Sequence, residues 1–298
     1  MKIGRAHWAG ATRLALIDEQ KQEVLFVEGS LAFHPNPVLA VIEQGLTASQ
    51  LMADVTARAA LKDVGFASPL SAFVRNVFAV GKNYHEHAME FDKSGFNATS
   101  GGSAIPAFPQ LFTKSTGTLA GPTDAIRFDP AHTSSVDYEG EIGVVIGTRC
   151  RNVPKAQALD QVFGFVALND VTARDLQKNH AQWFLGKSLD GFCPLGPWIA
   201  TRDEAPVESL QLRTWVNGEL RQDARMSQLI FDVGTLIETL SRAMTLLPGD
   251  IIATGTPVGV GIGFSPPKFL RHGDQVRIAV TGLGELNNRF EAVEAGVA

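Results

Sequence analysis

The chain has 298 residues, of which 45% are hydrophobic, and a net charge of −5 from 26 basic and 31 acidic residues. This composition is ordinary for a soluble globular protein, and the length allows one large core or two smaller ones. No basic patch accompanies the acidic balance, so we do not expect nucleic acid as a partner.

The sequence indicates neither a membrane span nor an export signal. The longest apolar runs, such as residues 162–168, are too short to cross a bilayer, and residues 1–10 lack the apolar stretch of a signal peptide. Cys150 and Cys193 form no CxxC pair, which is typical of a reducing compartment. We therefore expect a cytoplasmic protein with no membrane contact.

The first 70 residues are expected to form a small N-terminal α/β domain. Apolar residues at helical spacing predict a helix from Pro37 to about Ala60. The linker-like cluster at 67–71 marks the boundary with a catalytic domain at 71–298. Short β-rich runs, separated by charged or glycine turns, predict an antiparallel unit at 14–17, 23–27 and 31–33.

The remaining chain consists of many short β-rich runs broken by glycine and proline, so we predict a β-dominated α+β fold. The polar, Gly/Ser-rich stretch 91–109 lacks periodicity and is interpreted as a mobile loop or lid. Asn217-Gly218 is typical of a type I′ hairpin, and Asp232 of a helix N-cap. Helices are predicted at 154–162, 172–183 and 233–247, and strands at 127–128, 138–146, 164–169, 212–216, 219–221, 251–253, 275–281 and 288–293.

Two carboxylates lie two residues apart in one of these strands. Residues i and i+2 of a strand point to the same face, so Glu139 and Glu141 should project together, opposite Tyr138 and Ile142. Like charges held side by side repel unless a cation lies between them, and a divalent ion with oxygen ligands fits that place. The alternative is an exposed edge strand with two solvated carboxylates.

A third carboxylate, Asp170, closes the apolar strand 164–169. It is either a further metal ligand or the N-cap of the helix that follows, bonding the amides near Thr172 and Ala173. With Glu139 and Glu141 it would give three hard oxygen ligands and leave about three places on an octahedral Mg²⁺ for water or substrate. Such an open metal polarises a carbonyl group.

The segment from Asn83 to Glu90 offers a general base. If it is helical, His87 and Glu90 are at i and i+3 and within hydrogen-bond reach, and a carboxylate that orients an imidazole makes it a competent base. His85 competes for this role. The alternative is a polar surface helix with two ordinary histidines.

Two further segments carry polar groups that could face a substrate. Lys187 follows an aromatic-apolar run, so it either faces inward to stabilise an oxyanion or extends to solvent. The glycine-rich run 255–261 is followed by prolines instead of a helix, so it predicts no nucleotide fold. A tight loop that places the Thr256 hydroxyl near a ligand is the more useful interpretation.

Five motifs in this order resemble the fumarylacetoacetate hydrolase superfamily, and the resemblance covers the chain from about Val77 to its C-terminus. These motifs are Asn83-Tyr84 with His87-Ala88-Met89-Glu90, Asp137-Tyr138-Glu139-Gly140-Glu141, the run from Asn169 to Gln177, Gly186-Lys187-Ser188, and Thr254-Gly255-Thr256-Pro257.

The resemblance implies a mixed β-sandwich or roll core, usually in a homodimer. It implies Mg²⁺ or Mn²⁺, with Ca²⁺ as a substitute, on Glu139, Glu141 and Asp170. The founding enzyme of the family has an aspartate shortly before its histidine as a further ligand, and residues 78–81 offer none. The chain therefore resembles the shorter branch with three carboxylate ligands, which spans acylpyruvate hydrolases, decarboxylases, isomerases and lyases.

The resemblance also implies roles for the remaining polar residues. In similar hydrolases, residues matching His87 and Glu90 lie on a lid that orders when substrate binds, and they activate the attacking water. Substrate or oxyanion contacts are implied for Gln177, Lys187 and Thr256, and Arg174 is a plausible partner for a substrate carboxylate.

The predicted function is metal-dependent hydrolysis of a C–C bond in a small anionic 2,4-dioxo acid, such as fumarylpyruvate or maleylpyruvate. His87, oriented by Glu90, would deprotonate water, and Lys187 would stabilise the departing enolate. The alternatives are a 2-oxo acid isomerase or an oxaloacetate-type decarboxylase of the same family. A further alternative, a non-catalytic Ca²⁺-binding protein, fits poorly with site residues spread over five segments.

Overall fold

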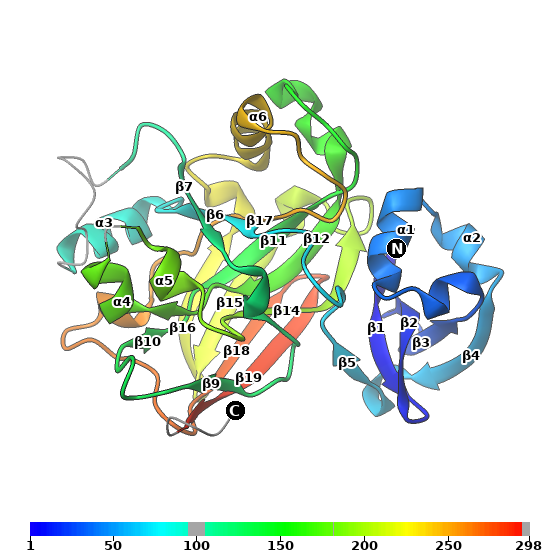
Figure 1. The fold of residues 1–298 in the computed structure, drawn as a ribbon, viewed down its shortest axis with the longest axis horizontal. Helices are drawn as coiled ribbons and strands as arrows, with labels where there is room; N and C mark the ends of the chain where they lie inside the picture. The colour runs from blue at the N-terminus through cyan, green and yellow to red at the C-terminus, as the bar shows by residue number, and fades with distance from the viewer. Residues whose placement is uncertain (95–104, 181, 294–298) are drawn as a thin grey trace.

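The computed structural model describes residues 1–94, 105–180 and 182–293. Within these ranges, no helix is both long and apolar enough to span a membrane. Strands outnumber helices throughout, and the β-dominated α+β prediction is confirmed (Figure 1).

The larger of the two main sheets is mixed and has twelve strands. Its path is β4-β3-β2-β1-β14-β12-β11-β17-β6-β7, with β5 added beside β1 and β8 beside β14. The strands are β1 (Lys2–Trp8), β2 (Ala11–Asp18), β3 (Glu23–Val27), β4 (Val55–Ala60), β5 (Gly65–Ala67), β6 (Val77–Gly81), β7 (Gln110–Lys114), β8 (Leu119–Ala120), β11 (Gly140–Ile146), β12 (Val162–Asn169), β14 (Cys193–Thr201) and β17 (Ile251–Ala253).

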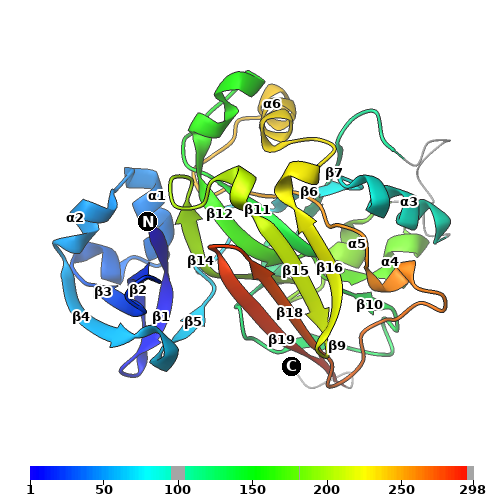
Figure 2. The ribbon, with the colours of Figure 1, turned by 180° about the vertical axis from the view of Figure 1, so that it is seen from behind.

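The N-terminal unit, β1 to β5, lies at one end of this sheet (Figures 1 and 2). The predicted antiparallel strands at 14–17 and 23–27 are confirmed as parts of β2 and β3. The predicted strand at 31–33 is wrong, because Ser30–Phe33 forms a 3-10 helix, and the single helix over 37–60 is also wrong. Two short helices, α1 (Pro37–Gln44) and α2 (Ala48–Met52), are followed by β4, because Val55–Ala60 pairs with β3. Since β1 also hydrogen-bonds to β14, both parts share one sheet, and the functional division at residue 70 stays a prediction.

A second sheet of five strands packs against the large one, with the main apolar core between them. The predicted hairpin is confirmed, because Asn217 and Gly218 both have the positive φ that a type I′ turn requires, at 50° and 82°. The sheet order is β16 (Glu219–Arg225), β15 (Gln211–Val216), β18 (Gln275–Val280), β19 (Gly284–Ala292) and β9 (Ile126–Phe128).

The helices of the main body are short. Asp232 caps α6 (Val233–Ala243) by accepting from the Thr235 N–H, as predicted. The predicted helix at 154–162 is a 3-10 helix over Lys155–Gln161. The other 3-10 segments are Ser30–Phe33, Leu61–Asp63, Thr116–Thr118, Val207–Ser209, Met226–Gln228 and Gly261–Gly263.

Three helices, α3 (His85–Lys93), α4 (Arg174–Asn179) and α5 (Phe184–Lys187), gather at the end of the body far from the N-terminal unit (Figures 1 and 2). The predicted helix over 172–183 is wrong at its start, because β13 (Thr172–Ala173) pairs with β10 (Val136–Asp137). The predicted loop at 91–109 is wrong at its start but agrees with the structure at its end. Helix α3 continues to Lys93 and β7 pairs with β6 from Gln110, while 95–104 lie outside the described residues.

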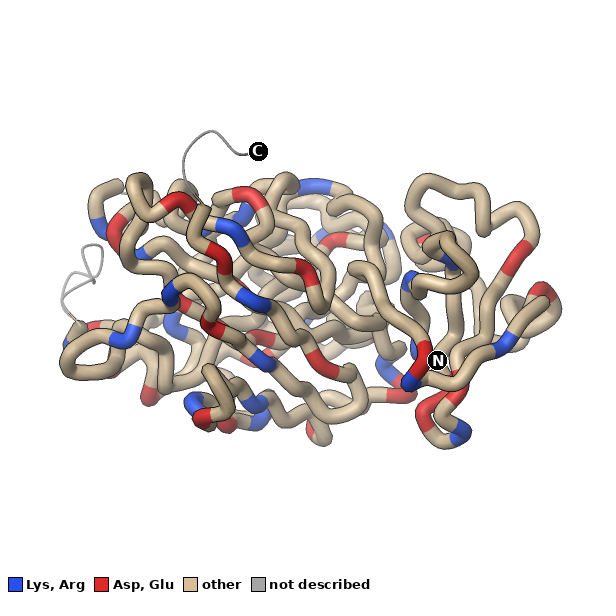
Figure 3. The backbone as a smooth tube through the Cα atoms, turned by 90° about the horizontal axis from the view of Figure 1, so that it is seen from below, with Lys and Arg blue, Asp and Glu red and all other residues tan. Residues whose placement is uncertain are grey.

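In the view of Figure 3, the basic and acidic positions of the described residues are interspersed along the backbone.

Candidate metal and catalytic centre

Antiparallel pairing of β11 with β12 brings the three predicted carboxylates to one place. Gly140 pairs with Asn169, so Glu139 just before β11 and Asp170 just after β12 meet at the same end of the pair. Oxygen atoms of Glu139, Glu141 and Asp170 all lie within 4.8 Å of one another, and all three side chains are buried. This carboxylate triad stands close to the gathered helices.

The structure contradicts both non-metal interpretations of these carboxylates. The exposed edge strand is wrong, because β11 lies between β12 and β17 and its glutamates are buried. The N-cap role of Asp170 is also wrong, since α4 begins after Ala173 and the Asp170 carboxylate is engaged elsewhere. Its Oδ1 forms an ion pair with Lys114 Nζ at 2.7 Å, and its Oδ2 accepts a hydrogen bond from Lys187 Nζ, also at 2.7 Å.

Three buried cations, Lys114, Arg174 and Lys187, surround the triad. Lys187 Nζ lies 2.7 Å from Glu139 Oε2 as well as from Asp170, so it faces inward, and the solvent-facing alternative is wrong. Arg174 Nη2 lies 2.6 Å from Glu139 Oε1. Lys114, at the end of β7, was not anticipated from the sequence. It also donates to the Val171 and Lys187 carbonyl oxygens and so fixes the segment behind the triad.

The charges around the two glutamates differ, and so do their pKa values. Burial alone would raise the pKa of Glu139, but Lys187 and Arg174 outweigh it and hold the value at about 2. Burial raises the pKa of Glu141 well above its ordinary value, and repulsion from Asp170 and Glu139 adds to the shift. The Glu141 carboxylate accepts one backbone hydrogen bond, from Gly255 N at 2.8 Å.

The excess of negative charge around Glu141 makes the triad a suitable site for a divalent cation. Three hard carboxylate donors converge, and for Glu141 the attraction of Lys187 and the hydrogen bond from the Gly255 N–H do not offset burial and the repulsion from Asp170 and Glu139. Oxygen ligands of this kind suit Mg²⁺, Mn²⁺ or Ca²⁺. The residues present therefore fit the metal that the resemblance implied.

The predicted His–Glu pair forms on α3. His87 Nδ1 lies 3.1 Å from Glu90 Oε2, and His87 is 4% exposed, so the polar-surface alternative is wrong for this histidine. Glu90 Oε1 accepts from the Gly259 N–H at 3.1 Å. His85 is exposed and lines a different cavity, between α3 and the segment 223–229.

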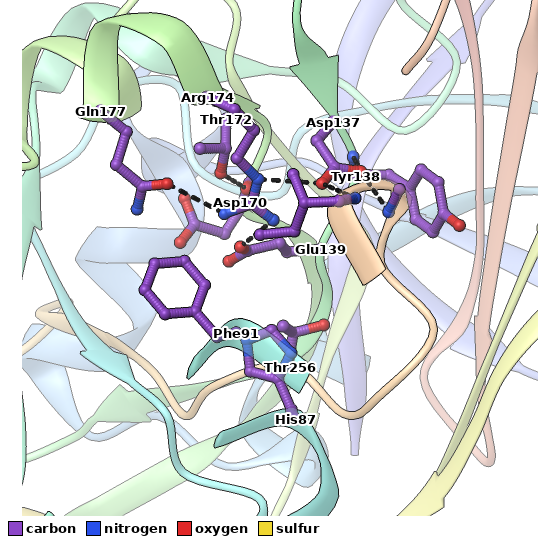
Figure 4. A network of polar contacts seen from close by, with 12 residues as sticks. His87, Phe91, Asp137, Tyr138, Glu139, Asp170, Thr172, Arg174, Gln177 and Thr256 are labelled. Atoms are coloured by element: carbon purple, nitrogen blue, oxygen red, sulfur yellow. Dashed lines mark hydrogen bonds and ion pairs between the residues drawn. The ribbon is translucent and has the colours of Figure 1, made fainter. Parts of the chain in front are cut away.

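Arg174 and Gln177 form a connected pair on α4. Arg174 is held by Asp137, whose carboxylate accepts from Arg174 Nε at 2.9 Å and from the N–H groups of Gly261 and Ile262 (Figure 4). Arg174 Nη1 donates to Gln177 Oε1 at 3.1 Å. Gln177 is buried and lines the pocket, so its NH₂ group is a donor that a ligand there could use.

The Thr256 hydroxyl donates to the Gly140 carbonyl oxygen at 2.9 Å and accepts from Gln222 Nε2 at 2.8 Å. These bonds tie the loop after β17 to the start of the metal-binding strand. Thr256 also borders the small pocket above the triad, which is lined by Val80, Gly81, Lys82, His87, Phe91, Phe112, Glu139, Arg174, Gln177, Trp183, Lys187 and Thr256.

The fold and the site agree with one family of proteins. Over residues 76–291 the chain matches the family model described as fumarylacetoacetate (FAA) hydrolase C-terminal. The chain belongs to the fumarylacetoacetate hydrolase family, as the sequence motifs indicated.

Similar proteins carry several activities in their names. The chain is 46% identical over 231 residues to the oxaloacetate tautomerase YisK of Bacillus subtilis, which covers 77% of this chain and 74% of that protein. The structure of a fumarylacetoacetate hydrolase from Exiguobacterium antarcticum is 39% identical, with a TM-score of 0.84 over 98% of this chain and 100% of that one. A maleylpyruvate hydrolase from Sphingobium sp. SYK-6 is 29% identical, with a TM-score of 0.78 over 98% and 100%.

Proposed function

We propose that this protein catalyses metal-dependent enolisation of a small 2-oxo acid, and that its reaction is the keto–enol tautomerisation of an oxaloacetate-type diacid. One observation carries the proposal. Among the residues that line the pocket, the carboxylate of Glu139 is held by Lys187 and Arg174, which leaves His87 as the group able to accept a proton.

The bound metal would be Mg²⁺ or Mn²⁺ on Glu139, Glu141 and Asp170, where it would polarise the 2-oxo group and acidify the neighbouring C–H bond. The chain supplies the other steps. Glu90 holds Nδ1 of His87, so Nε2 takes the proton from C3 of the substrate and returns it to the enol oxygen or to carbon.

The cationic and amide donors of the pocket suit an anionic substrate. The NH₂ group of Gln177, fixed by Arg174, donates to a carboxylate or carbonyl oxygen of the acid. Burial lowers the pKa of Lys187, but Asp170 and Glu139 more than offset this and raise it, so its ammonium stays charged beside the developing enolate. The name of the Bacillus subtilis relative supports oxaloacetate as the substrate type.

Hydrolysis of an acylpyruvate is the second candidate. The same His87–Glu90 pair could deprotonate water for attack at a C4 carbonyl, and the Sphingobium neighbour is named as a maleylpyruvate hydrolase. Lys187 would then stabilise the pyruvate enolate that departs. Tautomerisation ranks first because it needs one base and no bound water, and because the tautomerase relative is the more similar in sequence.

The two candidates separate in one assay. The Mg²⁺-loaded protein is offered oxaloacetate, fumarylpyruvate and maleylpyruvate, and both ultraviolet enol absorbance and products are followed. Faster equilibration of oxaloacetate, with no pyruvate formed, supports the tautomerase. Cleavage of an acylpyruvate into pyruvate and a second acid supports the hydrolase, and pyruvate from oxaloacetate would instead indicate a decarboxylase. The homodimer stays a prediction.

A further inference from the structure

One wall of the pocket above the triad consists of three aromatic rings. Trp183 packs against Phe91 of α3, with ring centroids 5.7 Å apart, and against Phe112 of β7, with centroids 5.4 Å apart. All three side chains line the pocket that contains His87 and Lys187. The wall therefore connects the triad side of the pocket with helix α3.

A lysine lies over each end of this wall. Lys187 Nζ, which contacts the triad, is 5.0 Å from the centroid of Phe112. Lys82 Nζ is 5.3 Å from the centroid of Phe91, and Lys82 is 2% exposed and lines the same pocket. Lys187 forms ion pairs with Glu139 and Asp170, whereas the proposed reaction gives no role to Lys82.

The backbone holds Lys82 in an unusual conformation. Its φ is 56°, in the left-handed region that residues other than glycine, asparagine and aspartate rarely adopt. Trp183 packs directly over Gly81, where a Cβ would overlap the indole ring. On the other side, the Asn83 side chain donates to the Phe231 and Thr254 carbonyl oxygens and accepts from the Phe231 N–H. Both neighbours fix the turn that directs Lys82 into the pocket.

We propose that Lys82 binds the second carboxylate of the substrate and thereby selects dicarboxylic 2-oxo acids over monocarboxylic ones. The inference rests on the proposed function for the position of the first carboxylate and 2-oxo group. A second carboxylate on the ligand would gain a charge-assisted contact with this ammonium group, whereas a terminal methyl group in the same place would gain none. The aromatic wall would pack along the short carbon chain between the two charged ends.

A structural role for Lys82 makes a different prediction. Asp92, also on α3, attracts the Lys82 ammonium, so the lysine could simply hold the helix in place. In that case, removal of either charge would disturb His87 and lower activity on every substrate alike. Selection of diacids requires instead that removal of Lys82 harms one class of substrate.

The test compares Lys82→Asn with the wild-type enzyme, both loaded with Mg²⁺. Asparagine tolerates the left-handed backbone, so the variant removes the charge without adding strain. Proton–deuterium exchange at C3 is followed by NMR for oxaloacetate and for 2-oxobutyrate, which has a methyl group in place of the distal carboxylate. We expect the KM for oxaloacetate to rise at least about tenfold, the scale of a lost charge-assisted bond, with 2-oxobutyrate unaffected.

Two control variants sharpen the result. Lys82→Arg should recover part of the preference for the diacid, since it restores a cation. Asp92→Asn should leave the preference unchanged. Equal losses on both substrates in Lys82→Asn, or the same change of preference in Asp92→Asn, would overturn the assignment.

Calorimetry of ligand binding tests the role of Lys82 without requiring any enolisation. The probes are 3,3-difluorooxaloacetate and 3,3-difluoro-2-oxobutyrate, which have no hydrogen at C3 and cannot enolise. If the wild type is inactive on both acids, the proposed function fails, but tighter binding of the difluoro diacid that disappears in Lys82→Asn still supports the role of Lys82. A preference that persists in Lys82→Asn refutes it.

Discussion

The Tyr138 hydroxyl donates a hydrogen bond to the Gly259 carbonyl oxygen at 2.7 Å. The N–H of the same glycine donates to Glu90, which in turn holds His87. Tyr138 directly precedes the triad member Glu139. A single glycine therefore joins the segment that presents the metal ligands to the helix that presents the base.

Tyr138→Phe should weaken this connection without touching the triad. The variant also loses the longer bond from Arg221 Nη1 to the hydroxyl, at 3.4 Å. Loss of the bond to Gly259, of about 1 kcal/mol, predicts roughly a fivefold drop in kcat if that bond positions His87. We expect KM and the bound Mg²⁺ to stay close to the wild-type values. A variant with lower Tm and unchanged kcat would show that the hydroxyl stabilises the fold only.

His87→Ala should remove the proton acceptor and lower kcat about 10²- to 10⁴-fold, the usual contribution of a general base. Its Mg²⁺ content should match the wild type, because His87 is not among the triad ligands. His85→Ala is the matched control, since His85 is exposed and lies outside the pocket. Full activity in His87→Ala would refute its role.

Gly263→Ala tests the position of Glu90 from the opposite side. A Cβ at residue 263 would overlap the Glu90 carboxylate, and the flexible end of that side chain would move away. We expect kcat to fall about as far as in Glu90→Gln, with little change in Tm. Identical kinetics to the wild type would mean that the observed Glu90 position is not required.

The two glutamates of the triad should respond in opposite ways to neutralisation in the metal-free protein. Glu141→Gln removes a carboxylate repelled by Asp170 and Glu139, so unfolding should cost about 1 kcal/mol more. Glu139→Gln takes away a shared partner of Lys187 and Arg174 and should destabilise the fold by about 3 kcal/mol. Denaturant titration with chelator measures both, and equal effects would contradict the charge assignment.

The same pKa shifts predict how metal-free stability depends on pH. The pKa of Glu141 is higher in the folded state than the ordinary value of 4.5, so the folded protein holds this proton more tightly. Its contribution to stability is present below pH 4.5 and is lost as pH rises through the folded pKa. Glu139, with a pKa of about 2, has the opposite slope and loses its contribution as pH falls from 4.5 towards 2.

Mg²⁺ should therefore raise Tm by an increasing amount as pH rises above 4.5, because the metal binds the deprotonated form of Glu141. Thermal unfolding with and without Mg²⁺ across this range measures the difference. In Glu141→Gln the pH dependence of that difference should flatten. A constant Mg²⁺ effect in the wild type would contradict a raised pKa at this position.

The sequence predicted those site residues whose spacing within one strand or helix places their side chains together. Strand alternation placed Glu139 and Glu141 together, the end of an apolar strand marked Asp170, and i,i+3 spacing paired His87 with Glu90. These features depend on a few neighbouring residues. Local spacing is enough to reveal them.

The features that the sequence did not predict depend on contacts between segments that are far apart in the chain. Lys114 reaches Asp170 from β7 at the sheet edge, and its surrounding sequence carries no motif. The alanine-rich segment 55–60 has helical composition but becomes β4 because β3 offers an unpaired edge. Thr172 and Ala173 leave the predicted helix for the same reason, since they pair with Val136 and Asp137. The contact between Lys82 Nζ and the Phe91 ring was not predicted either, because it depends on how the turn before α3 folds.

The most direct test of metal-dependent enolisation is the rate at which oxaloacetate exchanges between keto and enol forms, followed by ultraviolet absorbance. The protein is stripped with chelator and then restored with Mg²⁺ or Mn²⁺. We predict that catalysis disappears on stripping, returns with either ion, and stays absent in restored His87→Ala. Equal catalysis by the stripped protein, or by restored His87→Ala, would contradict the account.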